Sequence, residues 1–159
     1  QSEVQGGYSR RNQAEVDVIV ELVKAIDESL GENGIGGKTL GIITGYLAQK
    51  AALRQKVDPS RSAWPHLAEV EVDTVDAYQG RERDIVIYSV VRSNPEGKIG
   101  FLRDERRLNV ALSRAKELLI IVGDEDVELA DVTGTNPFYT VIQHIRSHSD
   151  HCQMEAFSG

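Results

Sequence analysis

The sequence has little of what a disulfide framework, a membrane anchor or a basic binding surface requires. Its 159 residues include one cysteine, Cys152, which excludes an internal disulfide and is compatible with a reducing compartment. No apolar run approaches the roughly 20 residues that span a bilayer, and the start of the chain lacks the apolar core of a signal peptide. The formal net charge is −7, so nucleic-acid binding would need a local basic surface. We expect a cytoplasmic protein without membrane contact, or a nuclear one if its source is eukaryotic.

A complete phosphate-binding loop is also missing. Residues 36–39 read Gly-Gly-Lys-Thr, the last part of the pattern G-x-x-x-x-G-K-[ST], but the first glycine of that pattern is replaced by Glu32. A phosphate loop follows a strand and opens a helix, whereas this stretch leads into the apolar, β-rich run 39–44. We therefore interpret it as a glycine-rich turn from a helix into a strand.

Hydrophobic periodicity divides the chain into alternating helices and strands that fit one domain. The first helix is predicted to begin after Asn12, with Glu15 completing a capping box, and to end at Gly31. Further helices are predicted at 48–57, 104–116 and 136–148, and strand patterns at 39–44, 68–75, 84–93 and 118–124. Strands rich in Ile, Leu and Val with helices between them predict a three-layer α/β/α fold with a mostly parallel sheet.

Polar residues gather next to these strands, and in sheets of this class ligands bind beyond the carboxyl ends of the strands. We place three clusters at such ends. The first consists of Tyr46 and Gln49, and the second of Asp76, Gln79, Gly80, Arg81, Glu82 and Arg83. The third consists of Arg106, Arg107, Asn109, Ser113 and Arg114. Spacing alone leaves the second cluster open between a solvated turn and a ligand site. An arginine held on a covered helix is usually there for an anion, which favours a site at Arg107 and Arg114.

Two long segments carry a family resemblance. "VDTVDAYQGRERDIVIYSVVRSN" followed by "GFLRDERRLNVALSRAKELLIIVGD" resembles motifs V and VI of superfamily 1 helicases, in the branch that contains senataxin and the nonsense-mediated-decay RNA helicase. "GIITGYLAQ" (41–49) is similar to motif IV, and "YSRRNQAEVDVIVELV" (8–23) is similar to the start of the second motor domain. The motifs follow the family's order from about Tyr8 to Asp124.

This resemblance implies a RecA-like domain with the P-loop NTPase fold but without its own phosphate loop. It implies that residues 1–159 are the second of two motor domains and a fragment of a longer chain, in keeping with a start at Gln1 without methionine. The upstream RecA-like domain would hold the phosphate loop and Mg²⁺, with ATP bound between the two domains. The implied function is an ATP-dependent helicase that moves along single-stranded DNA or RNA, and the isolated chain is expected to be inactive.

On the ATP side, the resemblance assigns roles residue by residue. Arg114 corresponds to the motif VI arginine that reaches the γ-phosphate, and Gly80 to the motif V glycine whose N–H lies near the phosphates. Glu82 corresponds to a glutamate that contacts either the ribose or the phosphate-bound water. Gln79 and Arg107 complete the implied nucleotide-binding set.

On the nucleic-acid side, motifs IV and V hold the backbone of the strand in this family. Thr44, Tyr46, Thr74 and Asp76 occupy the matching positions, and Thr74 is the strongest single candidate. These residues would bind a single strand without reading its sequence. Arg81, together with Gln79, is expected to help couple this site to the ATP site.

Other interpretations compete with this one. The alternative function is a non-catalytic α/β binding module, or a regulatory domain that contacts nucleic acid or a protein partner. A dinucleotide enzyme is excluded, because G-x-G-x-x-G followed by an acid about 20 residues later is missing. His144, His148 and His151 beside Cys152 lack a second ligand pair, so we predict no metal site. Trp64 is left open between an anchor in the core and a base-stacking platform.

Overall fold

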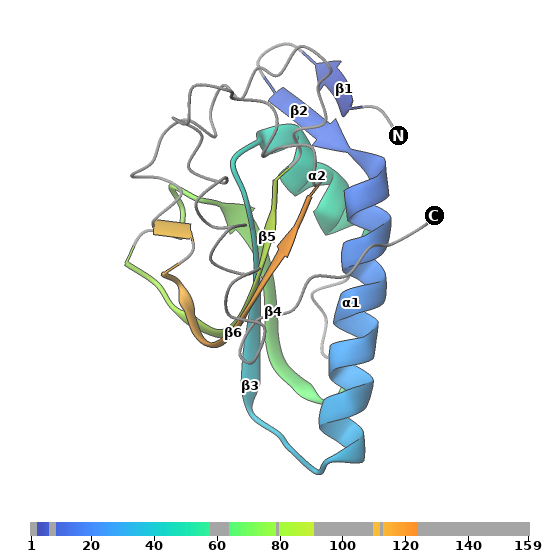
Figure 1. Ribbon diagram of the computed structural model, residues 1–159, viewed down its shortest axis with the longest axis vertical. Helices are drawn as coiled ribbons and strands as arrows, with labels where there is room; N and C mark the ends of the chain where they lie inside the picture. Colours follow the sequence, from blue (N-terminus) through green and yellow to red (C-terminus); the bar gives the residue numbers. More distant parts are fainter. Residues whose placement is uncertain are drawn as a thin grey trace, which may run out of the picture.

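The computed structural model describes residues 3–6, 9–57, 64–78, 80–90, 110–111 and 113–123. Its elements are β1 (Glu3–Gly6), β2 (Ser9–Asn12), α1 (Gln13–Glu32), β3 (Lys38–Thr44), α2 (Leu47–Lys56), β4 (Leu67–Thr74), β5 (Arg83–Ser89) and β6 (Ala115–Val122). Figure 1 shows the long helix α1 beside the central sheet, with the short antiparallel hairpin β1–β2 leading into it. The predicted helix 136–148 lies outside the described residues.

The central sheet is parallel throughout, as the apolar strands predict. It has four strands in the order β4-β3-β5-β6. β3 lies in the middle, with Ile42 opposite Val72 of β4 and Ile87 of β5. Each strand returns to the same direction through a crossover, which requires the connecting chain to pass over a face of the sheet.

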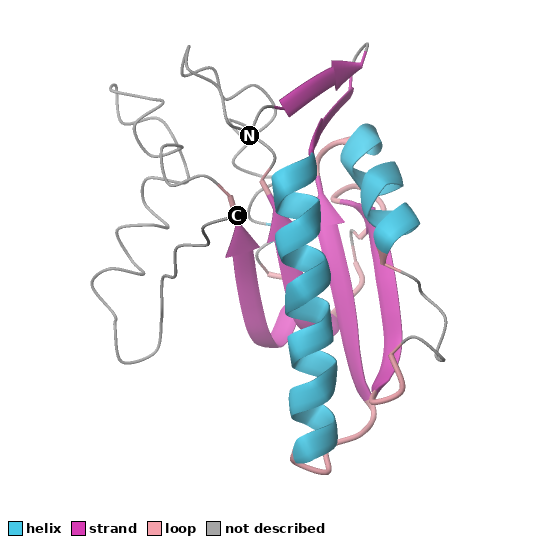
Figure 2. Ribbon diagram, turned by 90° about the vertical axis from the view of Figure 1, so that its right-hand side faces the viewer, coloured by secondary structure: helices cyan, strands magenta, loops and turns pink. Residues whose placement is uncertain are grey.

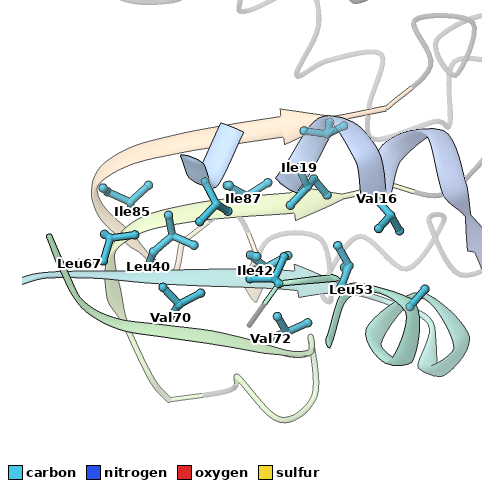
Figure 3. Packing of buried hydrophobic residues seen from close by; sticks show 14 residues of the cluster. Val16, Ile19, Leu40, Ile42, Leu53, Leu67, Val70, Val72, Ile85 and Ile87 are labelled. Atoms are coloured by element: carbon cyan, nitrogen blue, oxygen red, sulfur yellow. The ribbon is translucent and has the colours of Figure 1, made fainter. Parts of the chain in front are cut away.

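Each face of the sheet has its own core, so the predicted three-layer α/β arrangement is confirmed. Helices α1 and α2 lie on one face (Figure 2), where Ile19 and Leu53 pack on alternate residues of the strands such as Ile42 and Ile87 (Figure 3). Their side chains form one buried cluster. The opposite face carries a second cluster, in which Tyr78 packs with Ile43, Val75, Val86, Tyr88, Val90 and Ala111.

Helix α1 ends later than predicted. Gly31 is still helical, and the left-handed residue that stops the helix is Gly34, with φ +65°. The N–H of Ile35 bonds to the carbonyl of Leu30 at 2.9 Å, and the N–H of Gly34 bonds to that of Gly31 at 3.2 Å. These two bonds form a Schellman motif, which needs a residue that tolerates positive φ at the position of Gly34.

The Gly-Gly-Lys-Thr stretch is the turn that the sequence predicts. It connects α1 to β3, and Gly37 adopts φ +80° within it. Lys38 forms an ion pair with Glu117 of β6 at 2.6 Å. The N–H and hydroxyl of Thr39 both donate to a carboxylate oxygen of Asp84, at 2.9 and 3.2 Å. The lysine and threonine therefore join the amino ends of the strands.

Two predicted boundaries are wrong near the later strands. The helix expected at 104–116 is helical at Val110 and Ala111, but Ala115 already belongs to β6. Strand β5 ends at Ser89 instead of continuing to residue 93. In β6 the residues alternate poorly in burial, so hydrophobicity alone places its start too late.

Candidate functional site

Thr44 and Thr74, two of the residues predicted to bind single-stranded nucleic acid, lie side by side at the carboxyl edge of the β-sheet. Thr44, the last residue of β3, is the register partner of Thr74 at the end of β4. The same Thr44 is opposite Ser89 at the end of β5. The N–H of Val75 bonds to the carbonyl of Thr44 at 3.0 Å, which continues the pairing past the strand ends. The segments that resemble motifs IV and V thus meet at one edge.

The four residues at this edge differ in accessibility. Thr44 is completely buried, and its hydroxyl accepts a hydrogen bond from the N–H of Tyr46 at 3.4 Å. Tyr46, which precedes α2, is 9% exposed. Thr74 is partly exposed and Asp76 is exposed. Thr44 and Tyr46 therefore shape the turn between β3 and α2, while Thr74 and Asp76 present polar groups to the surface.

Three buried polar side chains, Glu15, Ser89 and Gln49, are hydrogen-bonded to one another at this edge. Ser89 donates from its hydroxyl to a carboxylate oxygen of Glu15 at 2.8 Å and accepts from the amide of Gln49 at 3.0 Å. All three side chains are buried. Glu15 was predicted to cap its own helix, and its carboxylate also accepts this bond from β5. Burial raises the pKa of Tyr88, with nearby Tyr46 and Glu15 adding to the effect.

Three of the predicted ATP-side residues, Gly80, Glu82 and Arg114, lie in two segments that contact each other at the start of β5 and β6. Arg114 lies in the turn before β6, where its Nη1 donates to the carbonyl of Arg81 at 3.2 Å. Its own carbonyl accepts the N–H of Arg83 at 2.9 Å. Gly80 and Glu82 flank Arg81, so they share this neighbourhood (Figure 1, the segments before β5 and β6). Glu82 is exposed.

Placing Arg83 and Arg114 at carboxyl ends was therefore wrong. Arg83 is the first residue of β5 and pairs with Ala115, the first residue of β6, so the group around Arg114 lies at their amino ends. The reason is the path of residues 75–82. After β4 the chain turns at residues 75–78 and runs back across the sheet face to start β5.

Tyr78 anchors that returning segment. It is completely buried, and its hydroxyl donates to the carbonyl of Glu71 at 3.2 Å. A Cβ on Gly41 of β3 would lie 2.9 Å from this hydroxyl, so only glycine allows so close an approach. Arg81 and Arg83 lie over the ring, with guanidinium carbons 4.6 and 5.8 Å from its centroid. Burial raises the pKa of Tyr78 far above its usual range, and the charge of Glu71 adds to the effect.

Charges alternate between β4 and the returning segment. Arg83 contacts Glu69 and Glu71 at 3.2 and 3.3 Å. Arg81 contacts Glu71 at 2.8 Å and Asp73 at 3.6 Å. This charge ladder, made of Arg81, Arg83, Glu69, Glu71 and Asp73, was missed in the sequence. Its signal is present as acids at every second position of β4 matched by arginines at every second position after the turn.

Asp73 is the end of the ladder nearest the carboxyl edge. Its Oδ1 accepts the Nζ of Lys50 at 2.9 Å and the N–H of Thr74 at 2.9 Å. Its Oδ2 lies 3.6 Å from Arg81 and 3.8 Å from Arg54. Partial burial acts to raise the pKa of Asp73, but the hydrogen bonds from Lys50 and Thr74 and the positive charges of Lys50 and Arg54 hold that pKa below its usual value.

Some predicted residues lie outside the described part of the chain. These are Gln79, Arg106, Arg107, Asn109, His144, His148, His151 and Cys152. Within the described residues, no three His, Cys, Asp or Glu side chains come close enough to hold a metal ion. Trp64 is partly buried and packs against the core beneath the helices, so its role as a core anchor is confirmed. None of the helices described here has the length and apolar character to cross a bilayer.

Comparison with known proteins places this geometry in a family. The family model described as "AAA domain" matches residues 1–126. The chain is 32% identical over 148 residues to "DNA polymerase alpha-associated DNA helicase A" of Saccharomyces cerevisiae, covering 93% of this chain and 19% of that protein. It is 53% identical over 95 residues to "Regulator of nonsense transcripts 1 homolog" of Drosophila melanogaster, covering 59% and 8%. Over 123 residues it is 39% identical to "Probable helicase senataxin" of Homo sapiens, covering 77% and 4%. The chain thus spans less than a fifth of these relatives.

Proposed function

Because the chain belongs to the AAA domain family, whose model matches residues 1–126, we propose that it is a motor domain of an ATP-dependent superfamily 1 helicase. More narrowly, we propose that it is the second of two motor domains in a longer protein. Relatives named as helicases support the first statement. The observation that carries the second is that Lys38 and Thr39 pair with Glu117 and Asp84 between strands, while Arg114 donates to the carbonyl of Arg81, the residue after Gly80.

On the ATP side, this domain supplies an arginine finger. Arg114 is held by its contacts to the carbonyls of Arg81 and Val110, which leaves its position fixed relative to Gly80. Gly80 has φ +83°, and among the described residues other than its chain neighbours no atom lies within 4 Å of the place where a Cβ would stand, so a phosphate has room to approach its N–H. A positioned arginine stabilises the charge that develops during phosphoryl transfer and is worth about 10³–10⁵ in rate.

The remaining ATP contacts are divided between this domain and its partner domain. Glu82 is exposed next to Gly80 and contacts the ribose or the water bound to the phosphates. Gln79 and Arg107 join this set. Mg²⁺ is held mainly by the upstream motor domain, which also supplies the phosphate loop.

On the nucleic-acid side, the carboxyl edge of the sheet carries part of the single-strand track. Thr74 and Asp76 present the accessible groups, and the buried Thr44 and Tyr46 hold the turn beside them. Contacts of this kind go to phosphates and sugars, so they position a strand without reading its bases. The formal charge of −7 means that this grip is local and is shared with the upstream domain.

The test is ATP turnover by this chain and by the full-length protein that carries it, each with and without single-stranded oligonucleotide. Circular dichroism first establishes that the isolated chain is folded. We expect no turnover by the chain alone and strand-stimulated turnover by the full-length protein. Turnover by the chain alone would place the whole ATP site within these 159 residues and contradict the two-domain proposal. A full-length protein that binds a strand without hydrolysing ATP would instead support the binding-module alternative.

A further inference from the structure

Two hydrogen-bond donors that suit a phosphate meet at the free edge of strand β4, and one carboxylate, that of Asp73, occupies both. β4 is at the end of the sheet, so one side of its backbone has no neighbouring strand among the described elements. On that side, the carbonyl of Val72 accepts two hydrogen bonds from the guanidinium of Arg54, at 2.8 and 3.1 Å. The N–H of Thr74 is bonded to Oδ1 of Asp73 at 2.9 Å.

Lys50 completes this arrangement from helix α2. Its Nζ lies 2.9 Å from the same Oδ1 of Asp73, and its side chain is 24% exposed. One carboxylate oxygen therefore receives a backbone N–H and an ammonium group, the pair of donors that also binds phosphate oxygens of nucleic acids. Thr74 is the residue expected to meet the strand, so these donors lie where a phosphate would arrive.

We propose that Asp73 is an internal competitor for a phosphate of the bound single strand. In the structure described here it occupies the N–H of Thr74 and the Nζ of Lys50. A strand phosphate takes over both donors, and the displaced carboxylate then pairs with Arg81. This inference rests on the proposed function, because it requires a strand at the carboxyl edge.

The second half of the exchange connects the bound nucleic-acid strand to Arg114. Arg81 already lies 3.6 Å from Oδ2 of Asp73, a longer contact than its 2.8 Å pair with Glu71, so a released Asp73 has an adjacent partner. The carbonyl of Arg81 accepts the guanidinium of Arg114. Strand binding would thus change the contacts of the residue that holds the arginine finger, which is a differential contact of the kind that coupling between two sites requires.

A purely structural role for Asp73 predicts something different. If Asp73 only protected the edge of the sheet, its loss would weaken the fold and lower strand affinity together. A competitor has the opposite sign, because its removal frees two donors and removes a negative charge from beside the phosphate. The direction of the affinity change therefore separates the two roles.

The test uses Asp73→Asn in the full-length protein, with single-stranded oligonucleotide binding measured by fluorescence anisotropy and ATP turnover measured with and without strand. We expect strand affinity to rise by about threefold or more, because a like charge is removed from the phosphate site. Stimulation of turnover by the strand should fall. Unchanged or lower affinity in a variant that folds as well as the wild type would overturn the competition. Unchanged stimulation would overturn the connection to Arg81.

Two further variants serve as controls. Lys50→Ala should lower strand affinity and reduce the slope of log affinity against log salt by about one, as for the loss of one phosphate contact. Glu69→Gln removes a charge from the same face of β4 but far from Thr74, and it should leave affinity and stimulation unchanged. Should the wild-type protein bind no strand at all, the proposed function itself fails. Binding that is insensitive to Asp73→Asn overturns only this inference.

Discussion

Gln49 donates a hydrogen bond from its Nε2 to the hydroxyl of Ser89 at 3.0 Å, and both side chains are completely buried. Through this bond the first turn of α2 is joined to the end of β5, and Ser89 joins the same point to Glu15 in the first turn of α1. Two helices and the central sheet therefore meet at one hydroxyl. The turn at Thr44–Tyr46 lies directly before α2, so the junction at Ser89 sets the position of that turn.

Ser89→Ala is expected to lower the free energy of unfolding by about 1–3 kcal/mol. The substitution removes one hydrogen-bond partner from each of two buried polar side chains, Gln49 and Glu15, and that is the usual cost of such a loss. Chemical denaturation measures the change. Ser29→Ala, on the exposed side of α1, is the matched control and should have little effect. Equal stability of the two variants would contradict the role of Ser89.

Thr39→Val tests whether the Gly-Gly-Lys-Thr stretch is only structural. It removes the hydroxyl that bonds to Asp84 but retains the N–H, so stability should fall by about 1 kcal/mol. ATP turnover by the full-length protein should remain within about twofold of wild type, and the same holds for Lys38→Ala, whose partner is Glu117. A large loss of turnover in Lys38→Ala without unfolding would mean that this lysine meets a phosphate.

Gly41→Ala is expected to disturb the segment that carries Gly80 and Glu82. The added Cβ would stand 2.9 Å from the hydroxyl of Tyr78 and 3.0 Å from Cγ of Arg83, so the ring must shift. Overpacking of this kind costs about 1–3 kcal/mol. Gly36→Ala is the control, because no atom lies within 4 Å of its Cβ position. Thermal denaturation compares the two, and an equally small effect of both would refute the close packing of Tyr78.

Thr74→Ala should weaken single-strand binding by about tenfold, the loss of one hydrogen bond to a charged phosphate, and leave ATP affinity nearly intact. The backbone N–H of Thr74 is retained, so part of the site survives. Oligonucleotide titration of the full-length protein measures the change. Thr39→Val, at the opposite end of β3, is the control for a threonine remote from the proposed nucleic-acid site. Undiminished strand affinity in Thr74→Ala would remove this residue from the track.

The sequence predicts the sheet and its helices well because their signals are local. In the run of residues 39–44 apolar side chains do not alternate with polar ones, so both faces of the strand must be covered. This run forms the inner strand β3, between β4 and β5. Likewise the order of motifs predicts that Thr44 and Thr74 belong to one edge, since the carboxyl ends of parallel strands coincide. These predictions need only periodicity and the direction of the strands.

The position of the Arg114 cluster could not be predicted in the same way. Spacing does not reveal that residues 75–82 cross the face of the sheet, so Gly80 and Glu82 were expected at the wrong end. What fixes this path is tertiary contact, namely the fit of Tyr78 against Gly41 and the pairing of Arg81 with Glu71. A glycine inside an apolar strand was the available signal for such a close approach.

The bond between Ser89 and Glu15 was hidden for a related reason. In the sequence, Glu15 stands three residues after Asn12 and fits a capping box, a local pattern with a local explanation. Ser89, which donates to its carboxylate, is 74 residues away. A buried polar contact over such a separation leaves no periodic signal.

The most direct test of the account is ATP turnover by the full-length protein carrying Arg114→Ala, at saturating single strand. Turnover is expected to fall by about 10³-fold or more, because the arginine finger is lost, with strand affinity within about twofold of wild type. Arg114→Lys keeps a positive charge without the planar fork, and it should recover little of the rate. Since Arg114 also bonds to the carbonyls of Arg81 and Val110, thermal denaturation must show that each variant is folded. Wild-type turnover in folded Arg114→Ala would contradict the assignment of this domain as the one that completes the ATP site.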